Sequence, residues 1–481
     1  MALLLRLARA LWLFGTLFLD YWTHHLLTRA AGRARSDERR GLRGRLRDWL
    51  RRRRERIDRR QARRLLRGML RLRGVYIKLG QVLSVMGGFL PRVYKTELEQ
   101  LQDRVPPQPF DVVSRTLASS LGKPVHRAFA RFEPEPIAAA SLGQVHEAWL
   151  HDGRRVAVKV LYPGIRDVVA TDLRVVRLAL RVYNRFVPVQ NLRAVYDALV
   201  DLLRRETDYL HEADCMERMA RNFAGQDDVR FPSVVRERTT RDVLTMTFMV
   251  GVKITDLEAL ERLDIDRRAL ATRLVQCFYE QLFVHRFFHA DPHPGNFLVQ
   301  RGPDGRPILV ILDFGAVSEV SEETIEGMVD VLQGFFEQRD ELVLRGFHRI
   351  GFVAEEGNRA LVEQTVLTYF RKLLKVRERT PGALMRARGA DLERLVDPEI
   401  ERAELRELMR SIRYPDGWFY VERASVIAFW LVGQIDPDLD ALAVGFPYVL
   451  PLLGRRLAMS GSEPGPADAP AAPVATAERA E

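Results

Sequence analysis

Cysteine is scarce in this sequence, which contains only Cys215 and Cys277 and no CxxC pair. A disulfide scaffold needs several cysteines, and a thiolate zinc finger needs them closely paired, so both classes are excluded. Two isolated thiols fit a reducing cytosol. Because free cysteine is usually buried, we expect both side chains in the core.

Long apolar runs are also missing. No stretch reaches 18 uncharged apolar residues, the length at which a membrane-spanning helix is expected. The clean run at residues 10–19 is too short, and Arg6, Arg9 and Asp20 interrupt its surroundings. No small-residue cleavage site of the signal-peptide kind follows it. We therefore predict neither a spanning helix nor a secretory leader.

Acidic residues are rare in one basic block. Residues 33–73 hold 19 arginines against five acids, a local charge of +14 in a chain of net charge +11, so the rest sums to about −3. Such a block suits an anionic surface, either a membrane or a nucleic acid. The apolar, aromatic segment before it favours an interfacial membrane anchor over residues 1–36. A helix docked on the protein's own surface is the plainer alternative, and we predict no nucleic-acid partner.

The remaining chain has a strand-containing region followed by a mainly helical one. A helix closed by Gly122 and a β-hairpin with "HDG" at its turn are the clearest elements. Residues 460–481 are rich in Pro and Ala, which predicts disorder. The expected helices are 37–73, 75–99 with a break at 87–91, 111–122, 165–224, 256–288 and 320–455, and the expected strands are 144–150, 155–161, 243–251 and 307–315.

Two charged residues stand at the ends of apolar strands. Lys159 lies in "RRVAVKV", where burial would be costly without an anionic partner. A surface lysine with a buried stem fits this motif equally well. Asp313 leaves the apolar strand in "ILDFG", and a carboxylate there is well placed for Mg²⁺ bridging phosphates. An ordinary turn is the alternative for Asp313.

The stretch "HADPHPGN", residues 289–296, fits a metal site, a phosphotransferase loop or a plain turn. Asp291 and Asn296 have the spacing of base and metal-binding asparagine in the kinase signature H-R-D-x-x-x-x-N, with His289 at the histidine position. A zinc site needs further ligands, and the other histidines are scattered. Lys159, Asp291, Asn296 and Asp313 occur in kinase order, which favours phosphoryl transfer.

The glycine-rich loop of protein kinases is replaced here by alanines. Ahead of Lys159, "PIAAASLGQV" (residues 136–145) carries Ala138, Ala139 and Ala140 where flexible glycines are expected. An alanine loop is stiffer and disfavours positive φ, so it must approach phosphates in another conformation. This predicts altered nucleotide selectivity.

These motifs, with "GVYIKLGQVLS", "LQDRVPP" and "ETDYLHEA", resemble the UbiB/AarF family of atypical kinases, the ADCK-like proteins that support ubiquinone biosynthesis in bacteria and mitochondria. The family's KxGQ hallmark corresponds to Lys78, Gly80 and Gln81, and the resemblance covers about residues 70–450. It implies an α+β, bilobal, protein-kinase-like fold with a small β-containing N-lobe, a mainly helical C-lobe and an amino-terminal KxGQ helical extension. The expected segments are 1–36 (amphipathic, membrane-associating), 37–73 (Arg-rich helix), 74–128 (KxGQ extension), 129–250 (N-lobe), 251–455 (C-lobe) and 456–481 (disordered tail).

The resemblance implies ATP and Mg²⁺ as cofactors. Lys159 is expected to contact the phosphates and pair with Glu212, Asp291 to be the catalytic aspartate, and Asn296 and Asp313 to hold Mg²⁺. The remaining nucleotide-side residues are then Ala138, Ala139, Ala140, Ser141, Lys78, Gln81, Glu206 and Asp208. By spacing, Glu206, Asp208 and Glu212 are expected within two turns of one helix.

The KxGQ extension is expected to cover the active site, with Glu206 and Asp208 engaging it. Such a lid favours ATP hydrolysis or a small lipid-like or phenolic acceptor over protein phosphorylation. The leading hypothesis is an ATP- and Mg²⁺-dependent atypical kinase or ATPase supporting ubiquinone or other isoprenoid-lipid biosynthesis. Alternatives are a protein or small-molecule kinase, and a pseudokinase scaffold of a lipid-biosynthetic complex.

The implied location is cytoplasmic, peripheral at the inner face of the membrane, with anionic lipid and quinone-biosynthesis proteins as partners. The residues specify no oligomeric state. Two departures from the family stand out: "SVMGG" (residues 84–88) lacks the usual arginine and aspartate after KxGQ, and Thr247 stands at the presumed hinge where glutamate is common.

Overall fold

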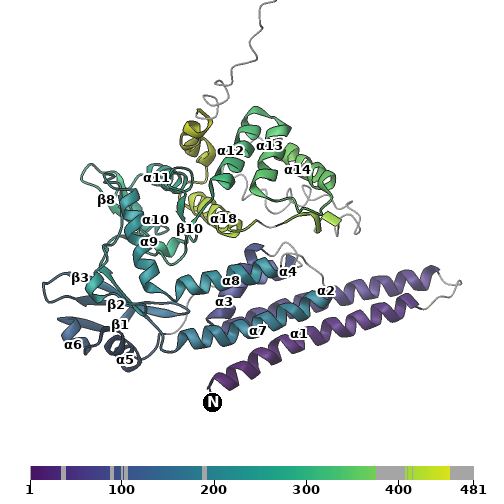
Figure 1. Ribbon diagram of the computed structural model, residues 1–481, viewed down its shortest axis with the longest axis horizontal. Helices are drawn as coiled ribbons and strands as arrows, with labels where there is room; N and C mark the ends of the chain where they lie inside the picture. The colour runs from purple at the N-terminus through teal and green to yellow at the C-terminus, as the bar shows by residue number, and fades with distance from the viewer. Residues whose placement is uncertain are drawn as a thin grey trace, which may run out of the picture.

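The computed structural model contains a small β-sheet lobe, a larger helical lobe and a long pair of amino-terminal helices (Figure 1). The structure describes residues 2–33, 40–86, 92–98, 101, 107–186, 192–374, 407–408, 410–413 and 415–454. The predicted break at 87–91, most of the predicted loop after residue 101, part of the long carboxyl-terminal helical region and the predicted disordered tail lie outside the described residues.

The small lobe is built on a four-stranded antiparallel sheet in the order β1-β2-β3-β5. The predicted hairpin is confirmed as β2 and β3, whose pairing runs from Gly143↔Leu161 to Trp149↔Arg155. The helix closed by Gly122 is also confirmed, because α5 ends there in the left-handed conformation. The strands and helices of this lobe are β1 (Arg131–Ala139), β2 (Gly143–Trp149), β3 (Arg155–Leu161), β5 (Val243–Thr247), α5 (Phe110–Leu121) and α6 (Val125–Ala128).

Strand β1 corrects the expectation of a loop over residues 136–145. The strand continues through Ala139, and its ladder shifts register around Pro136. Proline cannot donate to a sheet ladder and is confined to edges and bulges. Since β1 is an edge strand with two such irregularities, it accommodates its prolines, and the alanines expected in a loop belong partly to the strand.

A second four-stranded sheet, in the order β4-β9-β8-β6, underlies the larger lobe. A two-stranded ladder joins β7 and β10 beside it, with Val317 opposite His289. Strand β4 precedes the expected lobe boundary at residue 250, yet it pairs in parallel with β9. These strands are β4 (Val229–Arg230), β6 (Val252–Lys253), β7 (Phe287–His289), β8 (Phe297–Arg301), β9 (Pro307–Ile311) and β10 (Val317–Glu319).

Several predicted elements end earlier than expected, among them the strand predicted over residues 307–315, which ends at Ile311. The strand predicted over residues 243–251 stops at Thr247, because Gly251 (φ 153°) and its neighbours turn the chain toward β6. The helix predicted over 256–288 is instead two helices, α10 (Leu257–Arg262) and α11 (Arg267–Tyr279), followed by a π-helical turn that ends at Val284 and then by β7. Arg286 at positive φ separates this turn from β7, a conformation that ends a helix.

In the larger lobe α11 packs against β9 and α10 against β6, while α12 and α13 pack against each other closely enough to require glycine. A Cβ added at Gly346 would lie 2.4 Å from the carbonyl oxygen of Gly327, so the two helices meet backbone to backbone. The lobe's helices are α10 (Leu257–Arg262), α11 (Arg267–Tyr279), α12 (Glu322–Glu337), α13 (Asp340–Ile350), α14 (Arg359–Leu374), α18 (Trp418–Ile435) and α19 (Ala441–Gly445).

The amino-terminal helices α1 (Ala2–Arg33) and α2 (Arg40–Leu72) run side by side across α7, and α3 follows at once (Figure 1). Buried side chains of α1, such as Leu13 and Leu17, join the same core cluster as those of α2, α3 and α8. The connecting helices are α3 (Val75–Met86), α4 (Arg92–Leu98), α7 (Ile165–Phe186), α8 (Leu192–Glu206) and α9 (Tyr209–Asn222).

Arg6 fixes the start of α1 to this helical layer. Its guanidinium contacts both carboxylate oxygens of the buried Asp172 on α7, with Nη2–Oδ2 at 2.6 Å. It also donates to the carbonyl oxygens of Leu72 and Arg73, where α2 turns into α3. The first turns of α1 are therefore tied to the junction from which α3 begins.

Both cysteines are buried, as predicted. Burial raises the pKa of Cys215 to about 11 and that of Cys277 to about 12, so neither thiol is a ready nucleophile at neutral pH. Among the described residues, no helix combines the length and the hydrophobicity needed to cross a membrane.

Candidate functional site

Lys159 is the centre of a buried ion-pair cluster between the two lobes. Its Nζ contacts Glu212 Oε1 on α9 and lies 2.9 Å from Asp313 Oδ2, just after β9. Lys159 and Glu212 are 8 % and 2 % exposed, whereas the Asp313 side chain is 38 % exposed. The Lys159 ammonium is therefore buried together with two carboxylates, which offset the cost of burying its charge. The alternative of a surface lysine is wrong.

The pKa shifts in this cluster follow from burial and charge. Burial alone would lower the pKa of Lys159, but Asp313 and Glu212 outweigh it and raise the pKa above its ordinary value. Burial opposes ionisation of Asp313, yet the Lys159 ammonium holds that carboxyl's pKa below its usual range. For Glu212 burial is the strongest influence and raises the pKa. The ammonium and the Asp313 carboxylate are thus both charged at neutral pH.

The backbone after Asp313 helps to hold the carboxylates. Phe314 N donates to Glu212 Oε1 at 3.3 Å, and Gly315 N donates to Asp313 Oδ1 at 2.9 Å. A Cβ at Gly315 would lie within 4 Å of Asp313, Glu212 and Glu206 side-chain atoms. Glycine here keeps space open where three carboxyl side chains converge.

The loop containing Asp291 is organised by its own histidines. His289 is 2 % exposed, its ring stacks on Phe314, and its Nδ1 accepts from Asp291 N at 3.3 Å. Burial lowers the pKa of His289, which keeps the ring neutral at pH 7. His293 is exposed and caps the short helix Pro294–Asn296, its Nδ1 accepting from Gly295 N. Residue chemistry predicts no role for His293 beyond the family pattern, and the contact it makes here is structural.

Asn296 lies beside both Asp291 and the strand that leads to Asp313. Its Nδ2 donates to Asp291 O at 3.0 Å, which leaves the amide oxygen as an acceptor. Its carbonyl accepts from Leu312 N at 2.9 Å, one residue before Asp313. Carboxylate and amide oxygens are the ligands that Mg²⁺ prefers. Among the described residues, no group of three or more His, Cys, Asp or Glu is arranged for a metal ion.

The KxGQ helix α3 reaches this cluster through Lys78. Lys78 is 4 % exposed, and its Nζ lies 2.8 Å from Glu206 Oε1 at the end of α8. Gly80 is required by packing, because an added Cβ would lie 2.0 Å from Leu101 Cδ1 and 3.0 Å from Met69 Sδ. Gln81 is half-buried on the same helix. Lys78 is therefore a buried, paired lysine and not a solvated one.

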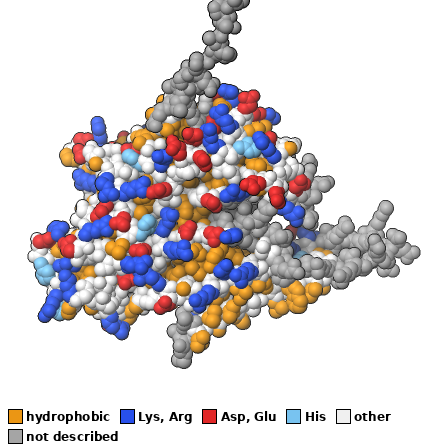
Figure 2. Space-filling model, in the orientation of Figure 1, with side chains coloured by type: hydrophobic (Ala, Val, Ile, Leu, Met, Phe, Trp, Pro, Cys, Tyr) orange, Lys and Arg blue, Asp and Glu red, His pale blue; other side chains and the backbone are white. Residues whose placement is uncertain are grey.

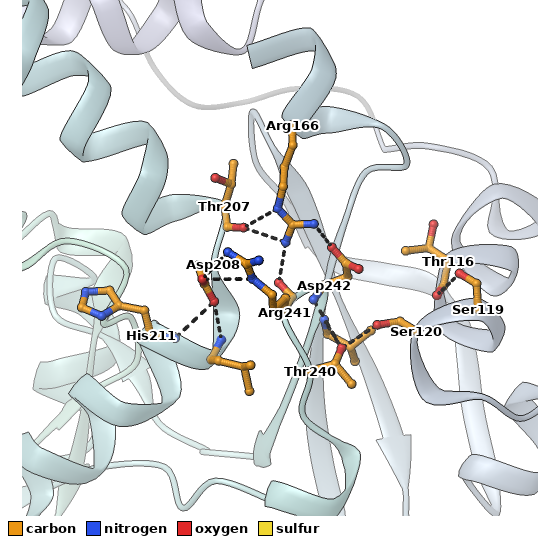
Figure 3. Close-up of polar contacts among 12 residues, drawn as sticks. Thr116, Ser119, Ser120, Arg166, Thr207, Asp208, His211, Thr240, Arg241 and Asp242 are labelled. Atoms are coloured by element: carbon orange, nitrogen blue, oxygen red, sulfur yellow. Dashed lines mark hydrogen bonds and ion pairs between the residues drawn. The ribbon is translucent and has the colours of Figure 1, made fainter. Parts of the chain in front are cut away.

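Asp208 contacts Arg241 and the start of α9. The expectation of a single helix over residues 206–212 is wrong, because the chain breaks at Asp208. Asp208 has extended backbone (φ −133°, ψ 93°) and separates α8 from α9 as the N-cap of α9, accepting from Leu210 N and His211 N. Its Oδ2 binds Arg241 Nη2 at 2.9 Å (Figure 3). Aspartate at an N-cap competes with helix continuation, so Glu206 and Glu212 come from two helices.

The break is held from the N-lobe side by Arg166. Its guanidinium donates to the carbonyl oxygens of Thr207 and Arg241 and to Asp242 Oδ1 at 2.6 Å (Figure 3). These bonds join the start of α7, the α8–α9 break and the entrance to β5. They fix the orientation at which α9 presents Glu212 to Lys159.

The alanine segment forms the end of β1 and a tight turn. Ala138 and Ala139 belong to the strand, and Ala140 N donates to Gly143 O at 2.8 Å. Ser141 is buried, and its carbonyl oxygen is 4.0 Å from the Cβ position of Gly74, between α2 and α3. The turn thus faces the start of the KxGQ helix.

Arg423 is the site residue that sequence reasoning missed. It lies on α18, is 4 % exposed, and its Nη2 is 2.7 Å from Asp291 Oδ2. The apolar stretch at residues 425–433 directs attention to packing there. A lone arginine inside a mainly apolar helix is the available signal.

The fold and these residues define a kinase-like, two-lobed α+β protein with a helical extension whose Lys78 pairs with Glu206. Residues 100–345 match the family model of the ABC1 atypical kinase-like domain. The chain belongs to this family of atypical kinases, which confirms the resemblance inferred from its motifs.

Curated relatives include both plant and bacterial proteins. Protein ACTIVITY OF BC1 COMPLEX KINASE 8, chloroplastic, of Arabidopsis thaliana is 33% identical over 413 residues, covering 82% of this chain and 54% of that protein. Probable protein kinase UbiB of Marinobacter nauticus is 31% identical over 396 residues, covering 80% of this chain and 69% of that protein. The chain thus spans about half the length of the chloroplastic relative.

Among solved structures, the complex of Rv3197 with erythromycin from Mycobacterium tuberculosis is 27% identical, with a TM-score of 0.50. The match covers 78% of this chain and 91% of that one. The similarity therefore extends over both lobes, and the family assignment places the chain among kinase-type proteins.

Proposed function

We propose that this protein is an ATP- and Mg²⁺-dependent atypical kinase or ATPase that supports ubiquinone or other isoprenoid-lipid biosynthesis. The observation that carries the proposal is the buried Lys159 ammonium held between Glu212 and Asp313. A lysine so placed is the phosphate-binding group of kinase-like folds, and its helix glutamate keeps it oriented.

Asn296 and Asp313 are the residues that would hold Mg²⁺. The donor set fits this ion, because a carboxylate oxygen and an amide oxygen are both hard ligands. The hydrogen bond from Leu312 N to Asn296 O keeps the two residues close together. When bound, Mg²⁺ neutralises phosphate charge. Lys159 then binds and orients the phosphates from the N-lobe side.

Asp291 is proposed to orient the attacking hydroxyl or water and to accept its proton. The neutral His289 ring stacks on Phe314 and accepts from Asp291 N, so it fixes the backbone of this residue without competing for the proton. The proton is thereby held at one carboxylate on a loop stiffened by Pro292 and Pro294.

The Lys78–Glu206 pair holds helix α3 next to the proposed site. This position favours water or a small molecule as the acceptor of the phosphoryl group. Lys78 is buried, and its helix packs against α8. A folded helix in this position occupies volume that a protein substrate would need. The proposed acceptor is therefore water or a small phenolic or lipid-like molecule.

The test is ATP turnover by the purified chain, with and without anionic liposomes and a phenol resembling a quinone precursor, using Asp313→Asn as the inactive control. We expect wild-type turnover at least tenfold above the variant, with both retaining their fold. Equal turnover despite Mg-ATP binding by the wild type would favour a pseudokinase scaffold. Transfer of labelled phosphate to a protein would favour a protein kinase.

We further propose that the protein works at an anionic membrane surface through α1. One face of α1 packs into the core, while the other exposes large hydrophobic side chains along its length (Figure 2, lower edge). Eight of them are 42–70 % exposed: Leu4, Leu5, Leu11, Trp12, Leu19, Trp22, Leu26 and Leu27.

Arginines of α2 lie beside this apolar face. The Arg64 guanidinium stacks over the Trp12 ring at 4.7 Å and that of Arg54 over Tyr21 at 4.5 Å. Further α2 arginines are exposed, namely Arg51, Arg52, Arg56, Arg59, Arg60, Arg63, Arg67 and Arg71. Apolar contact next to a row of cations favours anionic lipid.

Liposome co-sedimentation tests this surface. Deleting α1 would also remove core residues, so the better variant replaces Leu4, Leu11 and Leu19 with asparagine. The matched control makes the same change at Ile137, Val250 and Leu450, which are 50–59 % exposed on other elements. We expect the α1 variant to lose binding to anionic vesicles and the control to retain it. Equal binding by both variants would contradict the proposal.

A further inference from the structure

Helix α18 supplies the positive charge that touches Asp291. The loop from Asp291 to Asn296 contains no lysine or arginine, and the exposed His293 uses its Nδ1 to cap the loop. The cation comes instead from Arg423, which is more than 130 residues later in the sequence and lies beyond the family match at residues 100–345. The proposed catalytic carboxylate thus has its ion-pair partner on a distant segment of the chain.

The Arg423 guanidinium has donor capacity left over. Nη2 binds Asp291, but Nη1 is buried and has no hydrogen-bond partner among the described residues. A guanidinium is a rigid fork of five N–H donors that suits the paired oxygens of carboxylates and phosphates. A buried donor without a partner is costly unless a ligand satisfies it. One branch of the fork is therefore available to an anion next to Asp291.

A second unpartnered group lies one turn earlier on α18. Tyr420 is 5 % exposed, and its hydroxyl has no hydrogen-bond partner in the described part of the chain. Residues three apart share a helix face, so Tyr420 and Arg423 are neighbours. The Arg205 guanidinium lies over the Tyr420 ring at 5.2 Å, and α18 packs against the KxGQ helix α3. The two unpartnered groups therefore share one face of a helix that contacts Asp291 through Arg423 and also packs against α3.

We propose that Arg423 binds the transferred phosphoryl group through Nη1 while Nη2 holds Asp291, a role that rests on the proposed function. In transfer, the bond between phosphorus and the bridging oxygen of ADP breaks as the acceptor oxygen bonds to phosphorus, and the acceptor proton passes to Asp291. Once protonated, Asp291 no longer neutralises Arg423. The guanidinium charge then stabilises the phosphoryl oxygens, whose charge must be matched at that moment.

The distinguishing measurement compares the affinities of a non-hydrolysable β,γ-imido ATP analogue and of ADP, each with Mg²⁺, by titration calorimetry. Arg423→Gln should weaken triphosphate binding roughly tenfold or more relative to ADP, because a hydrogen bond to a charged group is lost. Arg423→Lys should recover part of the difference. Arg413→Gln is the matched control, since Arg413 is exposed and pairs only loosely with Asp416 at 3.6 Å.

Single-turnover ATP cleavage separates this inference from the proposed function. Arg423→Gln should lower the cleavage rate roughly a hundredfold, and added guanidinium ion should restore part of it in Arg423→Ala. If the wild type cleaves no ATP but Arg423→Gln still weakens the triphosphate selectively, the phosphate site survives and phosphoryl transfer fails. If both nucleotides weaken equally, or neither does, Arg423 is structural and the inference is wrong.

Discussion

At the residue scale, the site depends on charges that are buried together. Lys159 and Glu212 are almost fully enclosed, and Asp313 completes the cluster from the other lobe. Removing one member of a buried pair leaves its partner charged without compensation, which costs far more than the pair contributes. The same side chains therefore affect both folding and nucleotide binding, and variants can separate the two effects.

Lys159→Met should lower the free energy of unfolding by roughly 3 kcal/mol, because Glu212 then stays buried without its ammonium partner. The double variant Lys159→Met/Glu212→Gln should recover part of that loss, because the buried Glu212 charge is removed and only the Asp313 carboxylate, whose side chain is 38% exposed, stays without its ammonium partner. Neither variant should bind Mg-ATP tightly. Urea unfolding and nucleotide titration measure the two quantities, and a double variant as unstable as the single one would refute the ion-pair account.

Asp313 predicts a specific acid sensitivity. Its pKa is held below the ordinary value in the folded protein, so the stability it contributes is present above about pH 4, the pKa of an unfolded aspartate, and is lost as pH falls below it. The free energy of unfolding of the wild type should therefore decline more steeply between about pH 4 and pH 2 than that of Asp313→Asn. Parallel decline in the two proteins would mean that Lys159 does not stabilise the ionised carboxyl.

At the element scale, the break between α8 and α9 determines which acidic residues meet which lysine. Glu206 ends one helix and pairs with Lys78, while Glu212 begins the next and contacts Lys159. The intervening Asp208 caps α9 and binds Arg241. Had the helix continued, the two glutamates could not have taken these separate positions.

Asp208→Ala should lower the free energy of unfolding by about 1 kcal/mol through loss of the cap. Asp208→Asn keeps a capping oxygen and should cost less. Both variants should change Mg-ATP affinity by less than about threefold, because the carboxylate serves the helix and Arg241. A large loss of affinity in Asp208→Asn would restore the nucleotide-side role that the family resemblance implied.

Arg6 is the corresponding contact between α1 and the layer that carries α3. Arg6→Ala should destabilise the fold by roughly 3 kcal/mol, because Asp172 is 1% exposed and loses its guanidinium. Arg6→Ala/Asp172→Asn should be less destabilised than the single variant. If urea unfolding shows no change for Arg6→Ala, α1 is not anchored by this pair.

The local sequence picks out the kinase-order residues because each motif carries its own chemistry, and the structure brings Lys159 Nζ and Asp313 Oδ2 to 2.9 Å from each other. Lys159, Asp291, Asn296 and Asp313 stand at strand ends or in a proline-bounded loop, where short-range pattern decides structure. The helix break at Asp208 was missed because periodicity outweighed an available N-cap signal. Strand β1 was missed because its prolines are tolerated only at an edge, which local sequence does not reveal.

At the scale of the whole molecule, the site is assembled from distant segments. Lys78 comes from the amino-terminal extension, Lys159 from the small lobe, Asp291 and Asp313 from the larger lobe, and Arg423 from a late helix. Contacts such as Arg423–Asp291 join residues that no local pattern connects. Arg423 could therefore not be predicted from spacing, whereas the fold class followed from the family resemblance carried by the motifs.

The extension also joins the proposed membrane face to the proposed active site. Arg6 connects α1 to the α2–α3 junction, and α3 carries Lys78 to Glu206. The apolar face of α1 and the lid are therefore parts of one packed layer. This continuity is consistent with a catalytic site that works next to lipid.

The most direct test of the central claim is cleavage of the β–γ bond of labelled Mg-ATP under single-turnover conditions, with protein in excess, by the wild type and by Asp291→Asn. The account predicts that both proteins bind Mg-ATP with similar affinity and that only the wild type releases or transfers the labelled phosphate at an appreciable rate. Cleavage at equal rates in the two proteins would contradict the assignment of this site as a phosphoryl-transfer centre.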